Sequence, residues 1–152
     1  MTIAFGAVFR PNSASEAVVS LGSNIEPRGK YLAQALELLG DLPDTELVSV
    51  SSVIETEPVG VPAEYAGIAF LNQVAVFRTT LPVREFSRRM HEIEDELGRV
   101  RTVRNGPRTI DLDLIDFDGM IINEPELILP HPRAKERQFV MQPLAELGRS
   151  LG

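Results

Sequence analysis

Apolar residues alternate with polar ones in several short runs of the chain, which is the pattern of a strand with two different faces. The clearest run is RTIDLDLIDF at residues 108–117, and FLNQVAVF at residues 70–77 is another. Residues 17–21, which lead into a GSN turn, and the Val- and Ser-rich residues 46–55 also read as strands. A DGM turn precedes the short apolar run MII at residues 120–122, so a hairpin is expected there.

Two other segments space their apolar residues as a helix does. The first covers residues 31–40. The second is predicted to open at Pro82, with Thr80 as a candidate cap, and to end at Gly98. Residues 135–147 are expected to be partly helical. The predicted buried stripes are Leu32, Ala35, Leu36 and Leu39 in the first helix and Val83, Phe86, Met90, Ile93 and Leu97 in the second.

The order of these elements is strand–helix–strand–strand–helix–strand, with a hairpin and a C-terminal helix appended. It predicts an α+β fold, a ferredoxin-like antiparallel sheet with helices packed on one face. The other face would be left free for a site. Residues 1–16 read as a flexible N-terminal extension and residues 17–152 as a single domain, because this length supports one core.

Composition narrows the functional classes. The formal net charge of −7 argues against a general nucleic-acid binder, which would carry a broad basic surface. There is no cysteine, so disulfides and thiolate metal sites are excluded. No apolar run approaches the length of a membrane span. We therefore expect a cytoplasmic protein that contacts neither nucleic acid nor membrane, and we also expect it to be a monomer.

The strand at residues 108–117 carries two aspartates on one face. Since side chains alternate along a strand, Asp111 and Asp113 share one side while Leu112 and Leu114 share the other. Residues two apart in a strand lie roughly 6.5–7 Å from each other, so both carboxylates could reach one ion or a close pair of ions. All-oxygen ligands favour Mg²⁺. A solvated strand face is the simpler alternative.

Arginines come just before these aspartates. Arg99, Arg101, Arg104 and Arg108 occupy a stretch without acidic residues, and Asp111 and its neighbours follow at once. This neighbourhood suits phosphate held by arginine and by a carboxylate-bound metal, although a charged loop without function would look the same. Neither a Walker A sequence nor GxGxxG is present, so a glycine-rich phosphate cradle is not expected.

Three further candidate sites can each be explained by an ordinary structural role as well as by a functional one. His131, in LPHPR, stands between two prolines that could aim its ring, but a lone histidine is more often structural. His91 and Glu94 share a helix face, which could simply be exposed. Phe70 and Asn72 share a strand face and would suit a flat heterocycle, one by stacking and one by hydrogen bonding, but a core Phe beside a sheet-edge Asn is the more common arrangement.

Several stretches together resemble one family, the 6-hydroxymethyl-7,8-dihydropterin pyrophosphokinases. The resemblance covers residues 17–147, and GPRTIDLDL within it is highly specific to the family. The matching stretches are GPRTIDLDLI at 106–115, LGSN at 21–24, ETEPVG at 55–60, FLNQV at 70–74, LPHPR at 129–133 and RQFVMQPLAEL at 137–147.

This resemblance implies an ATP-dependent enzyme of folate biosynthesis that transfers pyrophosphate from ATP to the hydroxymethyl group of the pterin and releases AMP. It implies that Asp111 and Asp113 bind two Mg²⁺ ions and that Arg99 and Arg108 assist catalysis. The implied pterin positions are Thr56, Val59, Phe70, Asn72 and Phe139, with the two Phe rings sandwiching the pterin. The implied ATP positions are His91, Glu94, Arg101, Arg108, Leu114, His131 and Arg137.

The chain departs from the family pattern at four positions. Asn105 stands where many members have Trp, so ring stacking would be lost there, and Glu57 stands where Pro is common. Glu126 and Ile128 replace an Arg and a Thr that some members place near the nucleotide. No residue stands out as the base for the pterin hydroxyl.

Two rival functions remain open from the sequence. One is a non-catalytic ferredoxin-like binding or interaction module, which would have no Mg²⁺-dependent turnover. The other is a different metal-dependent nucleotidyl or phosphoryl transferase on the same fold. A product of AMP, not ADP, would separate the pyrophosphokinase from the second rival.

Overall fold

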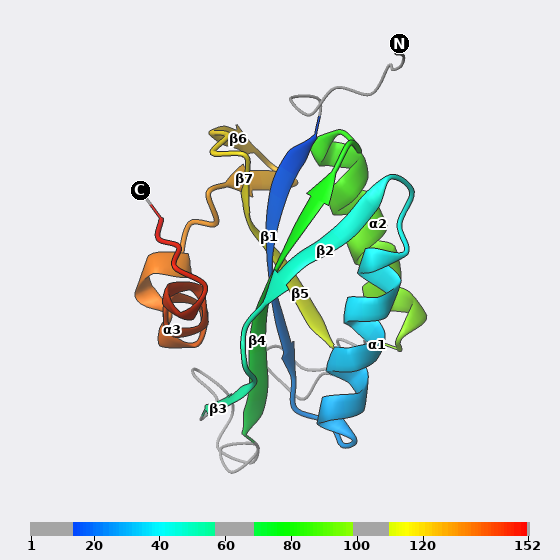
Figure 1. Ribbon diagram of the computed structural model, residues 1–152, viewed down its shortest axis with the longest axis vertical. Helices are drawn as coiled ribbons and strands as arrows, with labels where there is room; N and C mark the ends of the chain where they lie inside the picture. The colour runs from blue at the N-terminus through cyan, green and yellow to red at the C-terminus, as the bar shows by residue number, and fades with distance from the viewer. Residues whose placement is uncertain (1–13, 57–68, 99–109, 152) are drawn as a thin grey trace.

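An antiparallel sheet forms the centre of the computed structural model, which describes residues 14–56, 69–98 and 110–151 (Figure 1). Its strands run in the order β2-β4-β1-β5, and a fifth, short strand, β3, pairs with β4 beyond the end of β2. This confirms the expected α+β class with an antiparallel sheet. The strands are β1 (Ser15–Ser23), β2 (Thr45–Val50), β3 (Ile54–Thr56), β4 (Phe70–Thr79) and β5 (Asp111–Phe117).

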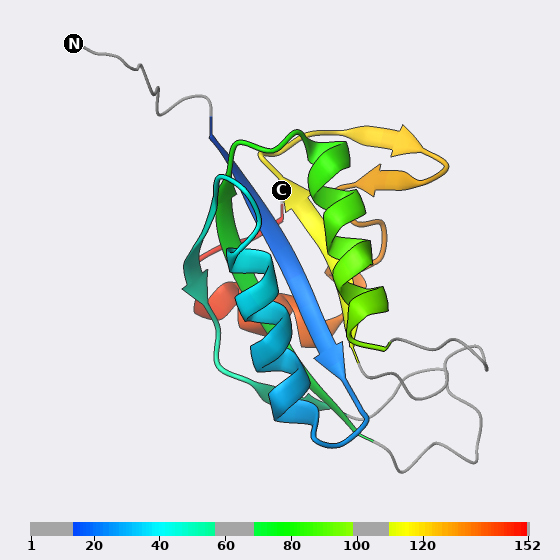
Figure 2. The ribbon, with the colours of Figure 1, turned by 90° about the vertical axis from the view of Figure 1, so that its right-hand side faces the viewer.

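Helices lie on both faces of this sheet (Figures 1 and 2). The pair α1 (Arg28–Gly40) and α2 (Val83–Glu96) covers one face. The opposite face carries α3 (Gln138–Glu146), which follows the short 3₁₀ helix η3 (Ala134–Glu136). None of the helices in the described ranges is long and apolar enough to cross a bilayer.

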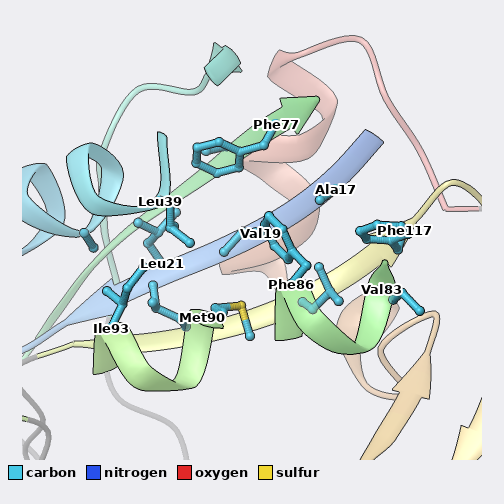
Figure 3. Packing of buried hydrophobic residues seen from close by; sticks show 14 of the residues in the cluster. Ala17, Val19, Leu21, Leu39, Phe77, Val83, Phe86, Met90, Ile93 and Phe117 are labelled. Atoms are coloured by element: carbon cyan, nitrogen blue, oxygen red, sulfur yellow. The ribbon is translucent and has the colours of Figure 1, made fainter. Parts of the chain in front are cut away.

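The larger core lies between the sheet and the helix pair α1 and α2 (Figure 3). Both predicted helical stripes face it, because apolar residues three and four positions apart lie on one side of a helix. Rings from β4, α2 and β5 meet at its centre, where Phe86 lies with its centroid 6.4 Å from that of Phe77 and 5.9 Å from that of Phe117. Helix α2 ends ahead of Gly98, whose positive φ of 84° suits a residue without a Cβ.

A smaller core lies on the opposite face. Val140 and Leu144 of α3 pack there against Val18, Val74 and Val76 of the sheet. The expectation that this face would be left free is therefore wrong for the part under α3. Among the described residues, this face carries polar side chains near the start of β5, including Asn72 and Asp111.

Strand boundaries differ from the sequence prediction in two places. Gly22 and Ser23 were expected in a turn, but both extend β1, which also begins two residues earlier than predicted, at Ser15. The single strand expected over residues 46–55 is two strands. Between them Ser51 turns its hydroxyl to accept the Val74 N–H at 3.0 Å, which ends the regular ladder.

Two local predictions about connections are also wrong. The hairpin after β5 does not pair back on β5; it is formed by β6 (Ile122–Glu124) and β7 (Leu127–Leu129), which pair with each other. Thr80 does not cap α2, because Pro82 occupies the N-cap position without a side-chain hydrogen bond. The Thr80 amide instead donates to the carbonyl of Asp44 at 3.2 Å.

Candidate active site

Strand β5 presents Asp111 and Asp113 on one face, as predicted. Leu112 and Leu114 point the other way and are buried in the larger core, whereas both aspartates are half-buried. Their face is the one that carries α3, so the two carboxylates lie on the side of the sheet opposite α1 and α2. The alternation of β5 thus separates the core of the protein from its chemistry.

Two basic side chains approach Asp113 from the segment after β7. Nε2 of His131 lies 4.0 Å from one carboxylate oxygen, and a terminal guanidinium nitrogen of Arg137 lies 3.8 Å from the other. The backbone N–H of His131 donates to the Ile115 carbonyl at 2.9 Å, which fixes this segment along the outer edge of β5. Residues far apart in the sequence are thereby gathered at one strand.

The ring of His131 has a defined orientation. The Arg133 backbone N–H donates to its Nδ1 at 3.2 Å, so Nδ1 is an acceptor and the proton of the neutral ring is on Nε2, facing Asp113. Burial, with Arg137 and Arg133 adding to it, lowers the pKa of His131, while Asp111 opposes the shift. A neutral ring that donates from Nε2 is the form these neighbours favour.

Behind β5, a buried carboxylate connects α2 to the strand. Glu94 accepts the backbone N–H of Leu112 at 2.7 Å, and its other oxygen lies 2.9 Å from Nδ1 of His91. Leu112 stands between the two aspartates, so Glu94 holds the backbone that carries them. The His91 ring is largely exposed beside it. Here the two residues form a structured pair, not the plain exposed helix face that the sequence left open.

A second polar cluster lies on β4 and β3. Nδ2 of Asn72 donates to the Thr56 hydroxyl at 2.6 Å, and the Asn72 side chain is buried. Phe70 is directly paired with Thr56 across the β3–β4 ladder and is half-buried. Residues two apart in a strand share a face, so Phe70 and Asn72 lie on the same side of the sheet.

Gly22 joins this cluster to the aspartates. It is paired with Asn72 on one side and with Asp111 on the other, so the three residues form one row across β4, β1 and β5. Neighbouring strands lie about 4.8 Å apart, which places Asn72 and Asp111 about 10 Å from each other on the same face. Because Gly22 has no side chain, Oδ1 of Asn72 and the ring of Phe70 lie close to its backbone.

Phe139, at the start of α3, stands over the same face. The Arg137 guanidinium carbon lies 5.5 Å from the centroid of its ring, within the range of a cation–π contact. Because Arg137 also approaches Asp113, this one side chain connects the Phe139 ring to the aspartate pair.

Some predicted site residues do not reach this face, and others lie outside the described residues. The Leu114 side chain is in the core with α1 and α2, so it cannot contact a ligand beside the aspartates; only its backbone could. Glu126 and Ile128 lie exposed in the β6–β7 hairpin. The predictions outside the described ranges are Val59, Arg99, Arg101 and Arg108, together with the departures Glu57 and Asn105.

The sequence prediction missed the role of Gly22. A glycine inside an apolar strand pattern is a known signal for the close approach of another group, and here the signal was read as a turn. It also missed two polar contacts that hold β3 and its neighbours, from Arg28 to Glu55 and from Glu146 to Ser52. Their partners are 27 and 94 residues apart in the sequence, and no local pattern predicts such pairs.

Comparison with known proteins shows which family the chain belongs to. The sequence model of the family 7,8-dihydro-6-hydroxymethylpterin-pyrophosphokinase (HPPK) matches residues 18–149. The chain belongs to this family. A 2-amino-4-hydroxy-6-hydroxymethyldihydropteridine pyrophosphokinase of Bacillus subtilis is 45% identical over 131 residues, which are 86% of this chain and 77% of the relative. The Pseudomonas aeruginosa protein of the same name is 39% identical, over 88% of this chain and 80% of its own length.

Solved structures agree on the fold. A crystal structure of wild-type HPPK-DHPS of Plasmodium falciparum, with pterin and p-hydroxybenzoate, superposes with a TM-score of 0.62 over 88% of this chain at 14% identity. The match covers 39% of the Plasmodium chain, so this chain spans well under half of that longer protein. At this identity, the likeness concerns the fold alone.

Proposed function

We propose that the row Asn72–Gly22–Asp111 brings the two substrates of the HPPK reaction together on one face of the sheet. As a member of the family, the chain is an ATP-dependent pyrophosphokinase of folate biosynthesis. It transfers the pyrophosphoryl group of ATP to the hydroxymethyl group of 6-hydroxymethyl-7,8-dihydropterin, and AMP is what remains of the ATP. The row is the single observation that carries the assignment of sites, because Asn72, the residue proposed to bind the heterocycle, lies about 10 Å from the carboxylate pair.

The pterin would bind over β4. Asn72 offers an amide that can donate and accept, and its hydrogen bond to Thr56 holds it in place. Phe70 and Phe139 supply aromatic faces from the sheet and from α3, which suits a flat ring held between them. For the pterin to use the Phe139 ring, the Arg137 guanidinium must yield or share that ring. Val59, the fifth predicted pterin residue, stays a prediction.

The aspartates fit Mg²⁺ by the chemistry of their donors. Two carboxylates on one strand face offer oxygen ligands, which Mg²⁺ prefers, and Mg²⁺ usually keeps waters and substrate phosphates as its other ligands. In the described part of the chain there is no cluster of three or more His, Asp or Glu that would make a complete protein cage. Each ion would therefore be held by the carboxylate of Asp111, of Asp113 or of both. When bound, the ions would neutralise charge on the triphosphate.

ATP would lie along β5, the edge strand. His131 can donate from Nε2 and Arg137 from its guanidinium, both on the aspartate side. His91 and Glu94 approach the same strand from the α2 side. A nucleotide that contacts both pairs would have to pass around the strand edge, which only an edge position allows. Arg99, Arg101 and Arg108 stay predicted phosphate ligands, and Leu114 a predicted backbone contact.

The reaction asks mainly for position and charge. Transfer of a phosphoryl-type group needs the attacking oxygen in line with the bond that breaks, and stabilisation of the charge that develops. The pterin hydroxymethyl oxygen attacks the β-phosphorus, the bond from that phosphorus to the α,β-bridging oxygen breaks, and AMP leaves with that oxygen. His131 and Arg137 would donate to phosphate oxygens as charge develops. The hydroxyl proton would leave to solvent, since no described residue is clearly placed to act as its base.

The finer description of the fold is also a proposal. The sheet order β2-β4-β1-β5, with α1 between β1 and β2 and α2 between β4 and β5, supports the ferredoxin-like arrangement. We extend this to residues 17–152 as a single domain. The monomeric state and the cytoplasmic location stay predictions.

A product assay tests the proposed function. The protein is incubated with ATP, Mg²⁺ and 6-hydroxymethyl-7,8-dihydropterin, and AMP and the pterin pyrophosphate are quantified together. Asp111→Asn and Asp113→Asn should each lower kcat by about 10²–10³, the typical cost of removing one electrostatic contact to the transition state. Asp118→Asn, in the turn after β5, is the matched control. ADP as the product, or aspartate variants as active as the parent, would refute the assignment.

A further inference from the structure

Arg28, the first residue of α1, makes an unusual set of contacts for a residue at a helix start. Its Nη1 donates to Oε2 of Glu55 at 2.7 Å and to the backbone carbonyl of Ala69 at 3.1 Å. Its Nε donates to Oε2 of Glu26 at 2.8 Å, and Oε1 of Glu26 accepts the Arg28 backbone N–H at 3.1 Å. One guanidinium thus joins the β1–α1 connection to both strands of the β3–β4 ladder.

The two contacts of Nη1 lie at the end of that ladder. Glu55 precedes Thr56 and Ala69 precedes Phe70, and Thr56 and Phe70 are the last pair of the ladder. Arg28 therefore holds both strands next to the pair that forms the predicted pterin wall. Since Glu55 and Thr56 point to opposite faces, the guanidinium lies on the α1 side while the Thr56 hydroxyl meets Asn72 on the site side.

Within the described residues, another polar attachment of the β3 region is the hydrogen bond from Ser52, just ahead of β3, to Glu146 of α3. Strand β3 is three residues long, and in the described part of the chain it pairs with β4 alone, since β2 has already ended. A ladder of this length is weak by itself. The contacts of Arg28 come from a helix that is anchored in the larger core through Leu32, Ala35 and Leu39. Helix α1, which is anchored in the core, therefore holds the short strand β3 in place.

We propose that Arg28 is a positioning residue for the pterin, which acts by holding β3 against β4 so that Thr56 keeps Asn72 in its binding orientation. This rests on the proposed function, in which Thr56, Phe70 and Asn72 bind the pterin. Arg28 touches neither substrate, and the residues assigned to ATP lie on or beside β5, at the far edge of the sheet from β3. Its loss should therefore affect the pterin and spare ATP.

The residue type fits this role. Arginine offers several N–H donors in a fixed planar fork, so it can satisfy Glu26, Glu55 and the Ala69 carbonyl at once, whereas the single ammonium of lysine cannot reach all three in this geometry. The Arg28 side chain is 21% exposed, and its carboxylate partners are 74% and 57% exposed. Exposed ion pairs contribute little to global stability, so the main effect of Arg28 is expected to be local.

The test compares Arg28→Met with a matched control, Arg78→Met. Arg78 lies in β4 and forms a similar ion pair with Glu46 across the sheet, at 2.9 Å, but at the end of the sheet distant from β3. For each protein, the pterin KM, the ATP KM and kcat are measured from AMP formation. Hydrogen exchange at the β3 amides is measured on the free protein.

Arg28→Met should raise the pterin KM about five- to tenfold, as expected if β3 is docked in only about a fifth to a tenth of molecules. The ATP KM should stay within twofold of the parent, and the β3 amides should lose protection. Arg28→Lys should recover part of the effect, and Arg78→Met should leave both constants unchanged. If Arg28→Met does not fold, Glu55→Ala removes the same Nη1–Oε2 contact from the other partner. It should likewise raise the pterin KM and leave the ATP KM unchanged.

The outcomes separate the two proposals. An active parent whose Arg28→Met and Glu55→Ala variants keep the parental pterin KM refutes the role of Arg28 alone. So does an equal rise in the ATP and pterin KM values, which would mean a general loss of structure. A folded parent that forms no AMP refutes the proposed function, and the positioning role falls with it.

Discussion

Replacing Gly22 by alanine should weaken pterin binding without destabilising the protein. Gly22 is paired with both Asn72 and Asp111, in the middle of the row that carries the proposed site. A Cβ added there would lie 3.2 Å from Oδ1 of Asn72 and 3.5 Å from Cδ1 of Phe70. The first contact is too tight to keep, so the Asn72 amide has to shift by a few tenths of an ångström.

The size of the effect follows from what that shift disturbs. Asn72 is held by a hydrogen bond of 2.6 Å to Thr56 and would offer its Oδ1 to the pterin. Losing one such hydrogen bond costs about 0.5–1.5 kcal/mol, which corresponds to an increase in the pterin KM of about 2- to 12-fold. The backbone at Gly22 is not left-handed, so alanine there restricts the unfolded chain and should offset the strain by about 0.4–1 kcal/mol.

The assay is steady-state AMP formation with each substrate varied in turn, together with the midpoint of thermal unfolding. Gly29→Ala is the control, because a Cβ at that position in α1 meets no atom within 4 Å. The expected result is a higher pterin KM, an unchanged ATP KM and an unfolding midpoint no lower than that of the parent. A Gly22→Ala protein with the parental pterin KM would refute the claim that the pterin lies over this row.

Three further substitutions test the framework around the site. Glu94→Ala removes the acceptor of the buried Leu112 N–H and should cost about 1–3 kcal/mol of unfolding free energy in urea; an unchanged midpoint would contradict this. In Ser52→Ala, the lost hydrogen bond is the main cause that lowers the pKa of Glu146. A lowered carboxyl pKa stabilises the fold above the ordinary glutamate pKa and loses this effect on acidification, so the stability gap between parent and variant should narrow in thermal melts from about pH 7 to pH 3; a gap that widens would be inconsistent. Phe86→Ala, at the centre of the larger core, should cost about 3–5 kcal/mol, and a loss below about 1 kcal/mol would disagree with its complete burial.

The parts of the fold that a local repeat specifies could be predicted from the sequence. The alternation of β5 assigned Leu112 and Leu114 to the core and Asp111 to the opposite face, and the structure confirms it. The helical stripe of α2 was likewise predicted, including Phe86 and Met90. Both patterns follow from the geometry of one element, so no knowledge of its neighbours is needed.

Features that depend on a distant partner were missed. The break between β2 and β3 arises because Ser51 bonds to β4 and Ser52 to Glu146, which is 94 residues away. The hairpin after β5 was assigned to the wrong pair of strands, since apolar runs as short as MII do not specify which neighbour they join. The role of Gly22 depends on Asn72, which is paired with it on the neighbouring strand. The candidate site is built from contacts between strands that are distant in the sequence. Sequence motifs could therefore predict which residues belong to the site, but not how those residues lie relative to one another.

In the proposed arrangement, the position of β5 at the sheet edge would let groups from both sides of the sheet contact ATP. On an inner strand, neighbours would block the backbone on both sides, and the faces would be accessible only from above or below. Here β1 pairs with one edge of β5, and the segment that carries His131 lies along the other edge. Under the proposed function, groups on the α2 side, such as His91, and groups on the opposite side, such as Asp113, would contact the same nucleotide. A pterin bound at Asn72, on an inner strand, would then lie on the other side of Gly22 from the aspartates. In the proposed arrangement, the pyrophosphoryl group would move from ATP on the edge strand β5 toward the pterin on the inner strand β4.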